Sequence, residues 1–244
     1  MGIADDLSTE TLTEAMPQRP VRSYPAVVST EAAALAWARE GAPHGAVVVA
    51  GYQASPRGRA GLPWTLVPDV GLGFSLVLRP QLPAAREGWV FAAAVCGLAD
   101  VAGEGATITW PDEVYRSEAR VGALGAWVEL GAEGVQWVVL NVLVDGVIAP
   151  RAPILAHAVT AIEARMEAPV QAVLADYRAR CATIGRQVRA RMIPMGPAGP
   201  RVEGTAADVL ADGSLTIKTA TGNRVAVRPQ NLGVLDDLGD TSCS

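Results

Sequence analysis

The stretch VGALGAWVELGAEGVQWVVLNVLV, residues 121–144, is the part of the sequence from which the fold is most readily predicted. Two long apolar runs, 121–130 and 135–144, flank the short segment Gly-Ala-Glu-Gly at 131–134. Apolar runs separated by a few residues that include glycine are typical of a β-hairpin. The sequence therefore predicts two neighbouring antiparallel strands joined by a tight loop.

Helical and strand-like segments surround this hairpin on both sides. Runs at 46–50, 74–78 and 107–110 have strand composition, and the last is stopped by a proline. Residues 32–40 and 84–102 have helical composition, and glycines close both segments. Two more helices are expected after the hairpin, and the second carries apolar residues at helical spacing on one face.

The two ends of the chain differ from this middle part. Residues 1–25 are polar and contain three prolines, so we expect a flexible N-terminal tail. After residue 192, prolines and glycines crowd together, and short alternating apolar runs follow with turns at Asp212-Gly213 and Gly222-Asn223. This pattern predicts a small all-β module of SH3-like size. The expected parts are a tail (1–25), a main domain (26–188) and a C-terminal β module with a short tail (189–244).

Composition excludes several classes of protein. Of the 244 residues, 50% are hydrophobic and 18% charged, which excludes disorder over most of the length. A net charge of −5 argues against a nucleic-acid partner. The sequence has no long apolar run and begins with an acidic segment, so we expect no membrane span, no signal peptide and a cytoplasmic location. Three cysteines and two histidines without motif spacing predict no metal site.

Four segments, taken in order, resemble the biotin protein ligases and, more loosely, the lipoate ligases. Ser29-Thr30 resembles the family's Ser-Thr-Asn start, and YQASPRGRAGLPW at 52–64 resembles its glycine-arginine loop with a following tryptophan. Residues 110–113, WPDE, resemble Trp-Pro-Asn-Asp, and residues 177–189 resemble the junction into the C-terminal barrel. The resemblance implies an α+β fold, in which a mixed sheet with packed helices is followed by a small SH3-like barrel.

The resemblance also implies a reaction and a site. Ligases of this type join a cofactor carboxylate to AMP and pass the acyl group to a carrier-protein lysine. Biotin or lipoate, ATP and a carrier protein are therefore the implied ligands and partner, with a homodimer as a further expectation. Arginine offers phosphate a permanently charged fork, and glycine lets backbone N–H groups approach it. Trp64 either covers the cofactor or anchors the loop in the core. The ligand-binding residues carried over are Ser29, Thr30, Gln53, Arg57, Gly58, Arg59, Trp64 and Asp112.

The chain departs from the family at the catalytic lysine, which contacts the cofactor carboxylate and the α-phosphate together. The only lysine is Lys218, in the C-terminal module, so this lysine has no counterpart. Counting forward from Trp110, its place is held by Arg120; counting back from residues 128–130, it is held by Gly122. Arg120 is thus the candidate catalytic residue, although a planar fork does not replace a compact ammonium.

Further departures change the walls of the expected pocket. Asp112 and Glu113 stand where the family has Asn-Asp, which adds negative charge beside an anionic intermediate. Pro56 replaces the first loop glycine, and LNVLV at 140–144 replaces a glycine-rich segment.

Three functions stay open on this reading. The first is a ligase-like protein that binds a carboxylate cofactor, its adenylate or a nucleotide, with weak, altered or lost ligase chemistry. The second is an active biotin or lipoate ligase that uses Arg120 and the loop arginines. The third is a non-catalytic interaction or regulatory module. Losing one preorganised donor at a developing oxyanion slows a reaction by on the order of 10²–10³, so we expect little or no biotinyl-AMP synthesis.

Overall fold

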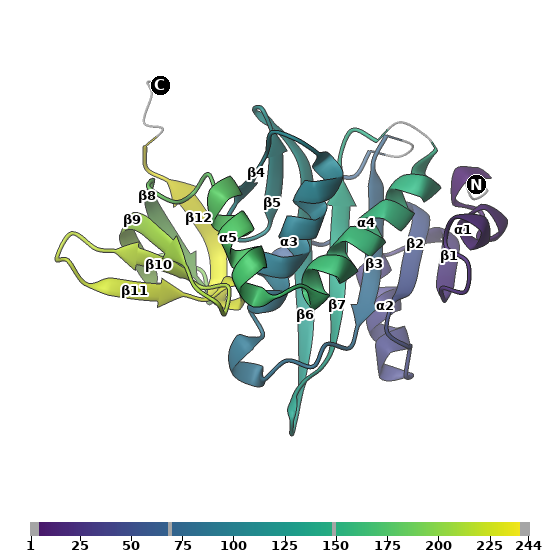
Figure 1. Ribbon diagram of the computed structural model, residues 1–244, viewed down its shortest axis with the longest axis horizontal. Coiled ribbons are helices and arrows are strands. Elements are labelled where there is room, and N and C mark those ends of the chain that lie inside the picture. Colours follow the sequence, from purple (N-terminus) through teal and green to yellow (C-terminus); the bar gives the residue numbers. More distant parts are fainter. Residues whose placement is uncertain (1–4, 68–69, 148–149, 240–244) are drawn as a thin grey trace.

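The computed structural model describes residues 5–67, 70–147 and 150–239 and contains two β-sheets (Figure 1). The larger sheet has seven strands in the order β1-β2-β3-β7-β6-β5-β4. Strands β1 and β2 are parallel, and the other neighbouring pairs are antiparallel. The strands are β1 (Val21–Val27), β2 (Ala46–Gln53), β3 (Leu72–Leu78), β4 (Ala106–Thr109), β5 (Glu113–Arg116), β6 (Ala119–Gly131) and β7 (Gly134–Val144). The mixed α+β architecture expected from the resemblance is confirmed.

The predicted hairpin is the pair β6 and β7, which stay in register from Gly122–Val144 to Gly131–Gly134 with one irregularity near Glu129. Strand β7 lies between β3 and β6, so most of its residues are buried on both faces. That position explains its nearly continuous apolar sequence. Strand β5 was not predicted, because its four residues carry two charges and one aromatic ring.

Helices cover both faces of this sheet (Figure 1). On one face lie α3 (Trp89–Ala102) and α4 (Arg151–Glu167), with α5 (Val170–Arg180) beside α3. On the other face lies α2 (Thr30–Arg39). The α3 sequence is apolar nearly all round, as expected of a helix buried between a sheet and a second helix. None of the helices in the described ranges is long and apolar enough to cross a membrane.

The expected flexible tail at 1–25 is wrong for the part that the structure describes. A short 3₁₀ turn, η1 (Asp5–Leu7), leads into α1 (Thr9–Ala15), and β1 then adds an edge strand to the sheet. Leu7 and Leu12 are fully buried, and the Asp6 carboxylate accepts hydrogen bonds from Arg151 at the start of α4. Pro25 misled the prediction, because an edge strand tolerates a proline that a central strand excludes. Residues 1–4 lie outside the described residues.

The C-terminal module is an SH3-like antiparallel sheet in the order β11-β10-β9-β8-β12. Its strands are β8 (Gln187–Met192), β9 (Arg201–Val209), β10 (Leu215–Lys218), β11 (Arg224–Val227) and β12 (Leu232–Asp237). The Trp110 indole N–H donates to the Gly213 carbonyl at 2.9 Å and joins this module to the main domain. Residues 240–244 of the expected module, including Cys243, lie outside the described residues.

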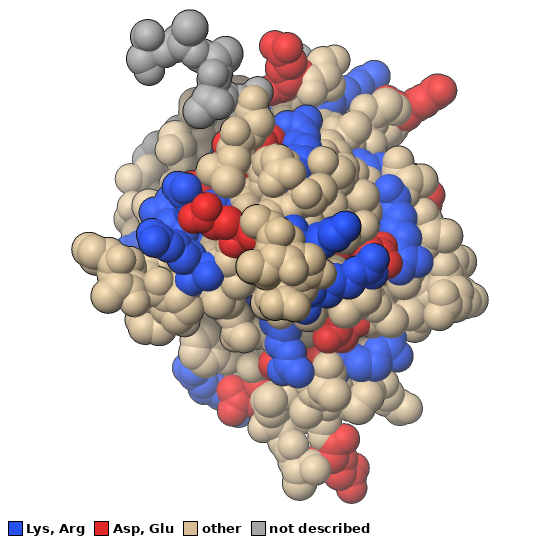
Figure 2. All heavy atoms as spheres, turned by 90° about the vertical axis from the view of Figure 1, so that its left-hand side faces the viewer, with Lys and Arg blue, Asp and Glu red and all other residues tan. Residues whose placement is uncertain are grey.

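Basic and acidic side chains lie next to one another on the exposed face of this module (Figure 2). Three arginines of β8 and its N-terminal neighbour pair with carboxylates on adjoining strands. The pairs are Arg186–Asp237, Arg189–Glu203 and Arg191–Asp236, at 2.6, 2.6 and 3.0 Å. The positive charge of these arginines is therefore compensated locally.

Candidate functional site

A chain of buried polar side chains runs beneath the start of α2. The backbone N–H of Thr30 donates to Gln53 Oε1 at 2.8 Å, and the Thr30 hydroxyl lies 3.2 Å from the same oxygen. Ser75 Oγ on β3 lies 2.9 Å from Thr30 Oγ1 and 2.8 Å from Asn141 Oδ1 on β7. With one hydroxyl proton, Ser75 donates to one of these oxygens at a time. The structure thus brings together Thr30 and Gln53, two of the expected ligand-binding residues.

One donor of this buried polar network, Nδ2 of Asn141, is left unsatisfied by the residues that the structure describes. The side chain is 3% exposed, and its Nδ2 faces the Glu31 carboxyl without making a hydrogen bond of ordinary length and angle to any group in the described part of the molecule. Burial raises the pKa of the neighbouring Glu31 carboxyl, while the Asn141 amide and the Arg57 charge oppose that shift. Leaving a buried donor unsatisfied costs about 1–3 kcal/mol. A ligand acceptor at this position would recover that free energy.

The pocket around these groups, called the α2 pocket below, is nearly filled. Thr30, Glu31, Gln53 and Asn141 line one part of it, and the 54–67 loop supplies Arg57, Trp64 and Leu66. The remaining free space is about 10 Å³. That is room for roughly one water molecule. A ligand the size of biotin therefore requires the loop to move.

Ser29 lies beside this pocket but acts as a helix cap. Its Oγ accepts a hydrogen bond from the backbone N–H of Ala32 at 3.1 Å. A capping serine satisfies one of the free N–H groups at a helix start. Ser29 is only 5% exposed, and the structure gives it this role in holding α2 in place.

Two glycines fit the glycine-arginine loop to the sheet. A Cβ atom on Gly125 of β6 would lie 2.7 Å from Arg59 N and from the Gly58 carbonyl carbon. Gly58 in turn lies directly against the Trp64 indole, which leaves no room for a side chain there. Trp64 lines both the α2 pocket and a second pocket between the two domains. It therefore packs on the loop and borders both candidate ligand spaces.

Arg59 is held by the protein itself. Its Nε donates to Asp112 Oδ2 at 2.8 Å, and the two side chains are 10% and 11% exposed. Its Nη1 donates to the backbone carbonyls of Leu232 and Gly233 in β12. The residue expected to bind phosphate thus joins the loop, the segment after β4 and the C-terminal module. Arg57 differs, because its side chain is exposed and donates to the Gly61 carbonyl at 3.1 Å.

The pKa of the Asp112 carboxyl, the acid of the Arg59–Asp112 pair, is strongly shifted. Burial raises its pKa from an ordinary 3.8 to about 6, and the Arg59 charge opposes the shift only in part. Asp112 is therefore ionised at pH 7.5 and largely protonated at pH 5. Protonation removes the negative charge that holds Arg59.

Of the two residues offered for the missing lysine, Arg120 is the one that faces the pocket between the domains. It pairs with Tyr115 across the β5–β6 hairpin and lines this pocket together with Asp112. Gly122 faces α3, since a Cβ there would lie 2.9 Å from the Leu98 side chain. Of the two, only Arg120 therefore borders a pocket that also holds Asp112.

In the pocket between the domains, called the interdomain pocket below, the basic side chains form ion pairs with neighbouring acidic side chains. Arg120 lies 3.2 Å from Glu113 Oε1 and 3.3 Å from Asp145 Oδ2. The cavity measures about 250 Å³, and its lining holds Arg59, Arg120, Asp112 and Glu113. The lining thus holds two guanidinium groups and two carboxylates, and Asp145, which lies outside the lining, also pairs with Arg120. A phosphate entering at neutral pH meets no excess of positive charge.

The sequence-based site missed Glu31, Ser75 and Asn141. Ser75 and Asn141 were detectable as single polar residues inside apolar strands, LGFSLVL and GVQWVVLNVLV. A buried polar side chain needs a partner, so each such residue points to a polar contact across the sheet. No group of three or more His, Cys, Asp or Glu residues in the described ranges is arranged to hold a metal ion.

Comparison with solved structures identifies the fold. The biotin protein ligase of Aquifex aeolicus, solved in complex with biotin and ATP, superposes with a TM-score of 0.68 over 89% of this chain and 99% of that one. This chain has the biotin protein ligase fold. Sequence identity to the Aquifex enzyme is 17%, a level at which the similarity establishes the fold alone.

Two further structures share the biotin protein ligase fold. A biotin protein ligase-like protein of unknown function from a Silicibacter species gives a TM-score of 0.65 at 17% identity, over 88% of this chain and 96% of that one. The biotin acetyl coenzyme A carboxylase synthetase of Helicobacter pylori, solved with biotinylated ATP, gives 0.59 at 18% identity, over 86% and 100%. No protein-family model and no curated protein sequence matches this chain.

Proposed function

We propose that this chain uses the biotin protein ligase fold to bind a small carboxylate ligand in the α2 pocket, and that its adenylation chemistry is weak, altered or lost. The observation that carries the proposal is the pairing of Arg59 with Asp112 at 2.8 Å and of Arg120 with Glu113 and Asp145. Both arginines line the interdomain pocket.

The chemistry of adenylation explains why this pairing matters. The ligand carboxylate attacks the α-phosphorus of ATP, a C–O–P bond forms, and the bond to the leaving pyrophosphate breaks. Both reactants are anions, so the transition state needs cations that are free to face them. Arg59 and Arg120 are already engaged by carboxylates and, in the case of Arg59, by two backbone carbonyls. The interdomain pocket therefore offers little electrostatic stabilisation to the negatively charged transition state of this step.

The α2 pocket supports binding more directly. Asn141 Nδ2 offers a buried donor, the Glu31 carboxyl offers an acceptor, and Arg57 supplies an exposed guanidinium at the loop. A ligand with a neutral amide or urea group at one end and a carboxylate at the other satisfies all three. Biotin has this pattern; the dithiolane ring of lipoate has neither the donor nor the acceptor.

Isothermal titration with biotin, lipoate, ATP and biotinyl-AMP at pH 7.5 tests the proposal. We expect binding of biotin or biotinyl-AMP that Arg57→Gln weakens and that Arg224→Gln, an exposed arginine in β11, leaves unchanged. Binding of none of the four would favour the interaction module. Transfer of biotin to a carrier domain would establish an active ligase.

The runner-up, an active ligase, rests on one specific observation. The pKa of Asp112 is about 6, so protonation below that pH releases Arg59 for phosphate. Adenylation that appears only in acid, and at neutral pH in Asp112→Asn, would support this second function.

A further inference from the structure

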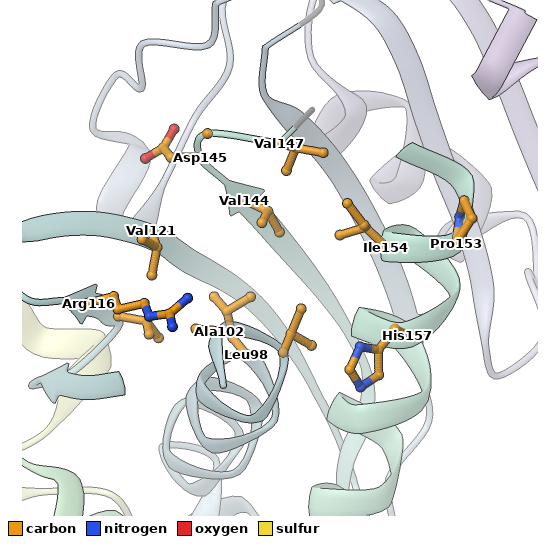
Figure 3. A pocket seen from close by; sticks show the side chains of 13 residues that line it. Leu98, Ala102, Arg116, Val121, Val144, Asp145, Val147, Pro153, Ile154 and His157 are labelled. Carbon is orange, nitrogen blue, oxygen red and sulfur yellow. The ribbon is translucent and has the colours of Figure 1, made fainter. Parts of the chain in front are cut away.

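A separate apolar cavity of about 600 Å³ lies on the α3 and α4 side of the sheet (Figure 3). Its apolar walls come from the end of α3, the start of α4 and the ends of β6 and β7. The apolar lining residues are Leu98, Val101, Ala102, Val114, Val121, Val144, Val147 and Ile154. This volume falls in the range of small-molecule sites, about 300–1,000 Å³.

This cavity is distinct from the α2 pocket. The two spaces share no lining residue. The α2 pocket is lined by residues of α2, whereas the apolar cavity is lined by residues of α3 and α4, and these helices cover opposite faces of the sheet.

Three polar side chains border the apolar cavity: Arg116 from β5, Asp145 after β7 and His157 on α4 (Figure 3). Asp145 is already paired with Arg120 at 3.3 Å. Arg116 has no ion-pair partner among the residues that the structure describes. The cavity thus combines an apolar wall with one exposed cation at its border that makes no ion pair within the described ranges.

We propose that this cavity binds an unbranched aliphatic monocarboxylate, with its chain against the apolar wall and its carboxylate on Arg116. The apolar lining disfavours sugars and nucleotides, whose hydroxyl groups would lose hydrogen bonds to water. A single free guanidinium matches a single carboxylate, which it binds through two parallel N–H groups. His157 lies on α4, across the cavity from Arg116.

Titration of the full chain with decanoate, decanol and decylamine tests the proposal. Decanoate should bind more tightly than decanol, and decylamine should bind weakest, because Arg116 repels a cation. Arg116→Gln should weaken decanoate binding by roughly tenfold or more and leave decanol binding unchanged. Arg224→Gln is the matched control and should change neither.

Filling the cavity gives a second arm that does not depend on charge. Ala102→Phe, or Ile154→Phe if the first variant does not fold by circular dichroism, should abolish binding of decanoate and decanol alike. Equal binding of the three ligands, or decanoate binding that neither Arg116→Gln nor a cavity-filling variant changes, would overturn the proposal. Arg57→Gln should leave decanoate binding intact, so this test is independent of the α2 pocket.

Discussion

The α2 pocket and the interdomain pocket treat their polar groups in opposite ways. In the α2 pocket, neutral side chains satisfy one another through Gln53, Thr30, Ser75 and Asn141, and one buried donor is left over. In the interdomain pocket, arginines are matched with carboxylates, so no cation is left over. An unsatisfied buried donor can gain a hydrogen bond from a ligand, whereas paired charges stabilise the folded protein. The two pockets of one fold thus differ in whether their polar groups are already satisfied within the protein.

The largest expected effect comes from breaking the Arg59–Asp112 pair. Arg59→Gln leaves a buried carboxylate without its cation and removes the contacts to β12, which should lower the free energy of unfolding by about 3 kcal/mol at pH 7.5. Arg57→Gln is the control and should change stability little, because Arg57 is exposed. Urea denaturation of both variants measures the difference. Equal free energies of unfolding for the two variants would contradict the inference that Arg59 joins the loop to Asp112 and to the C-terminal module.

A smaller effect should follow from disturbing the contact between loop and strand. Gly125→Ala places a methyl group 2.7 Å from the loop backbone, and overpacking of this kind costs about 1–3 kcal/mol. In Gly131→Ala, on the same strand, the nearest atoms are side-chain atoms at 3.6 Å or more. Trypsin should cleave the loop at Arg57 faster in Gly125→Ala than in Gly131→Ala. Cleavage at the same rate would show that the loop does not depend on this contact.

The polar chain of the α2 pocket gives the next effect. Ser75→Ala removes the hydroxyl between Thr30 and Asn141 and should destabilise the protein by about 1–2 kcal/mol. Thr160→Val removes an exposed hydroxyl on α4 and serves as the control. If the α2 pocket binds biotin, Ser75→Ala should weaken that binding as well, measured by titration calorimetry. Unchanged stability would show that the buried chain is dispensable.

The remaining effect is a slope of stability with pH, which is confined to acid conditions. Asp112 has a pKa of about 6 when folded and an ordinary 3.8 when unfolded, so the folded state binds more protons between these values. Stability should therefore fall as pH rises from 4 to 6, by at most about 1.4 kcal/mol per pH unit. Asp112→Asn should remove that contribution. Denaturation curves that share the same slope for wild type and variant would contradict the shifted pKa.

The sequence predicted local elements well and long-range pairing poorly. The hairpin at 121–144 was predictable because both strands and their loop are contiguous. The edge strand β1 was not, since its pairing with β2 depends on contacts that the proline-containing segment does not reveal by itself. Long-range contacts limited the prediction of the candidate site in the same way. Motifs located Arg59 and Asp112 separately, but nothing local indicates that they meet across 53 positions or that Arg59 also bonds to the backbone of β12.

Pyrophosphate release is the measurement that tests the central claim most directly. The protein is incubated with biotin and ATP at pH 7.5, and released pyrophosphate is followed with a coupled enzyme assay. The charge compensation of Arg59 and Arg120 predicts no detectable release, together with biotin binding that Arg57→Gln weakens. Release at roughly one per second, lost on Arg120→Ala, would contradict the account and establish an active ligase.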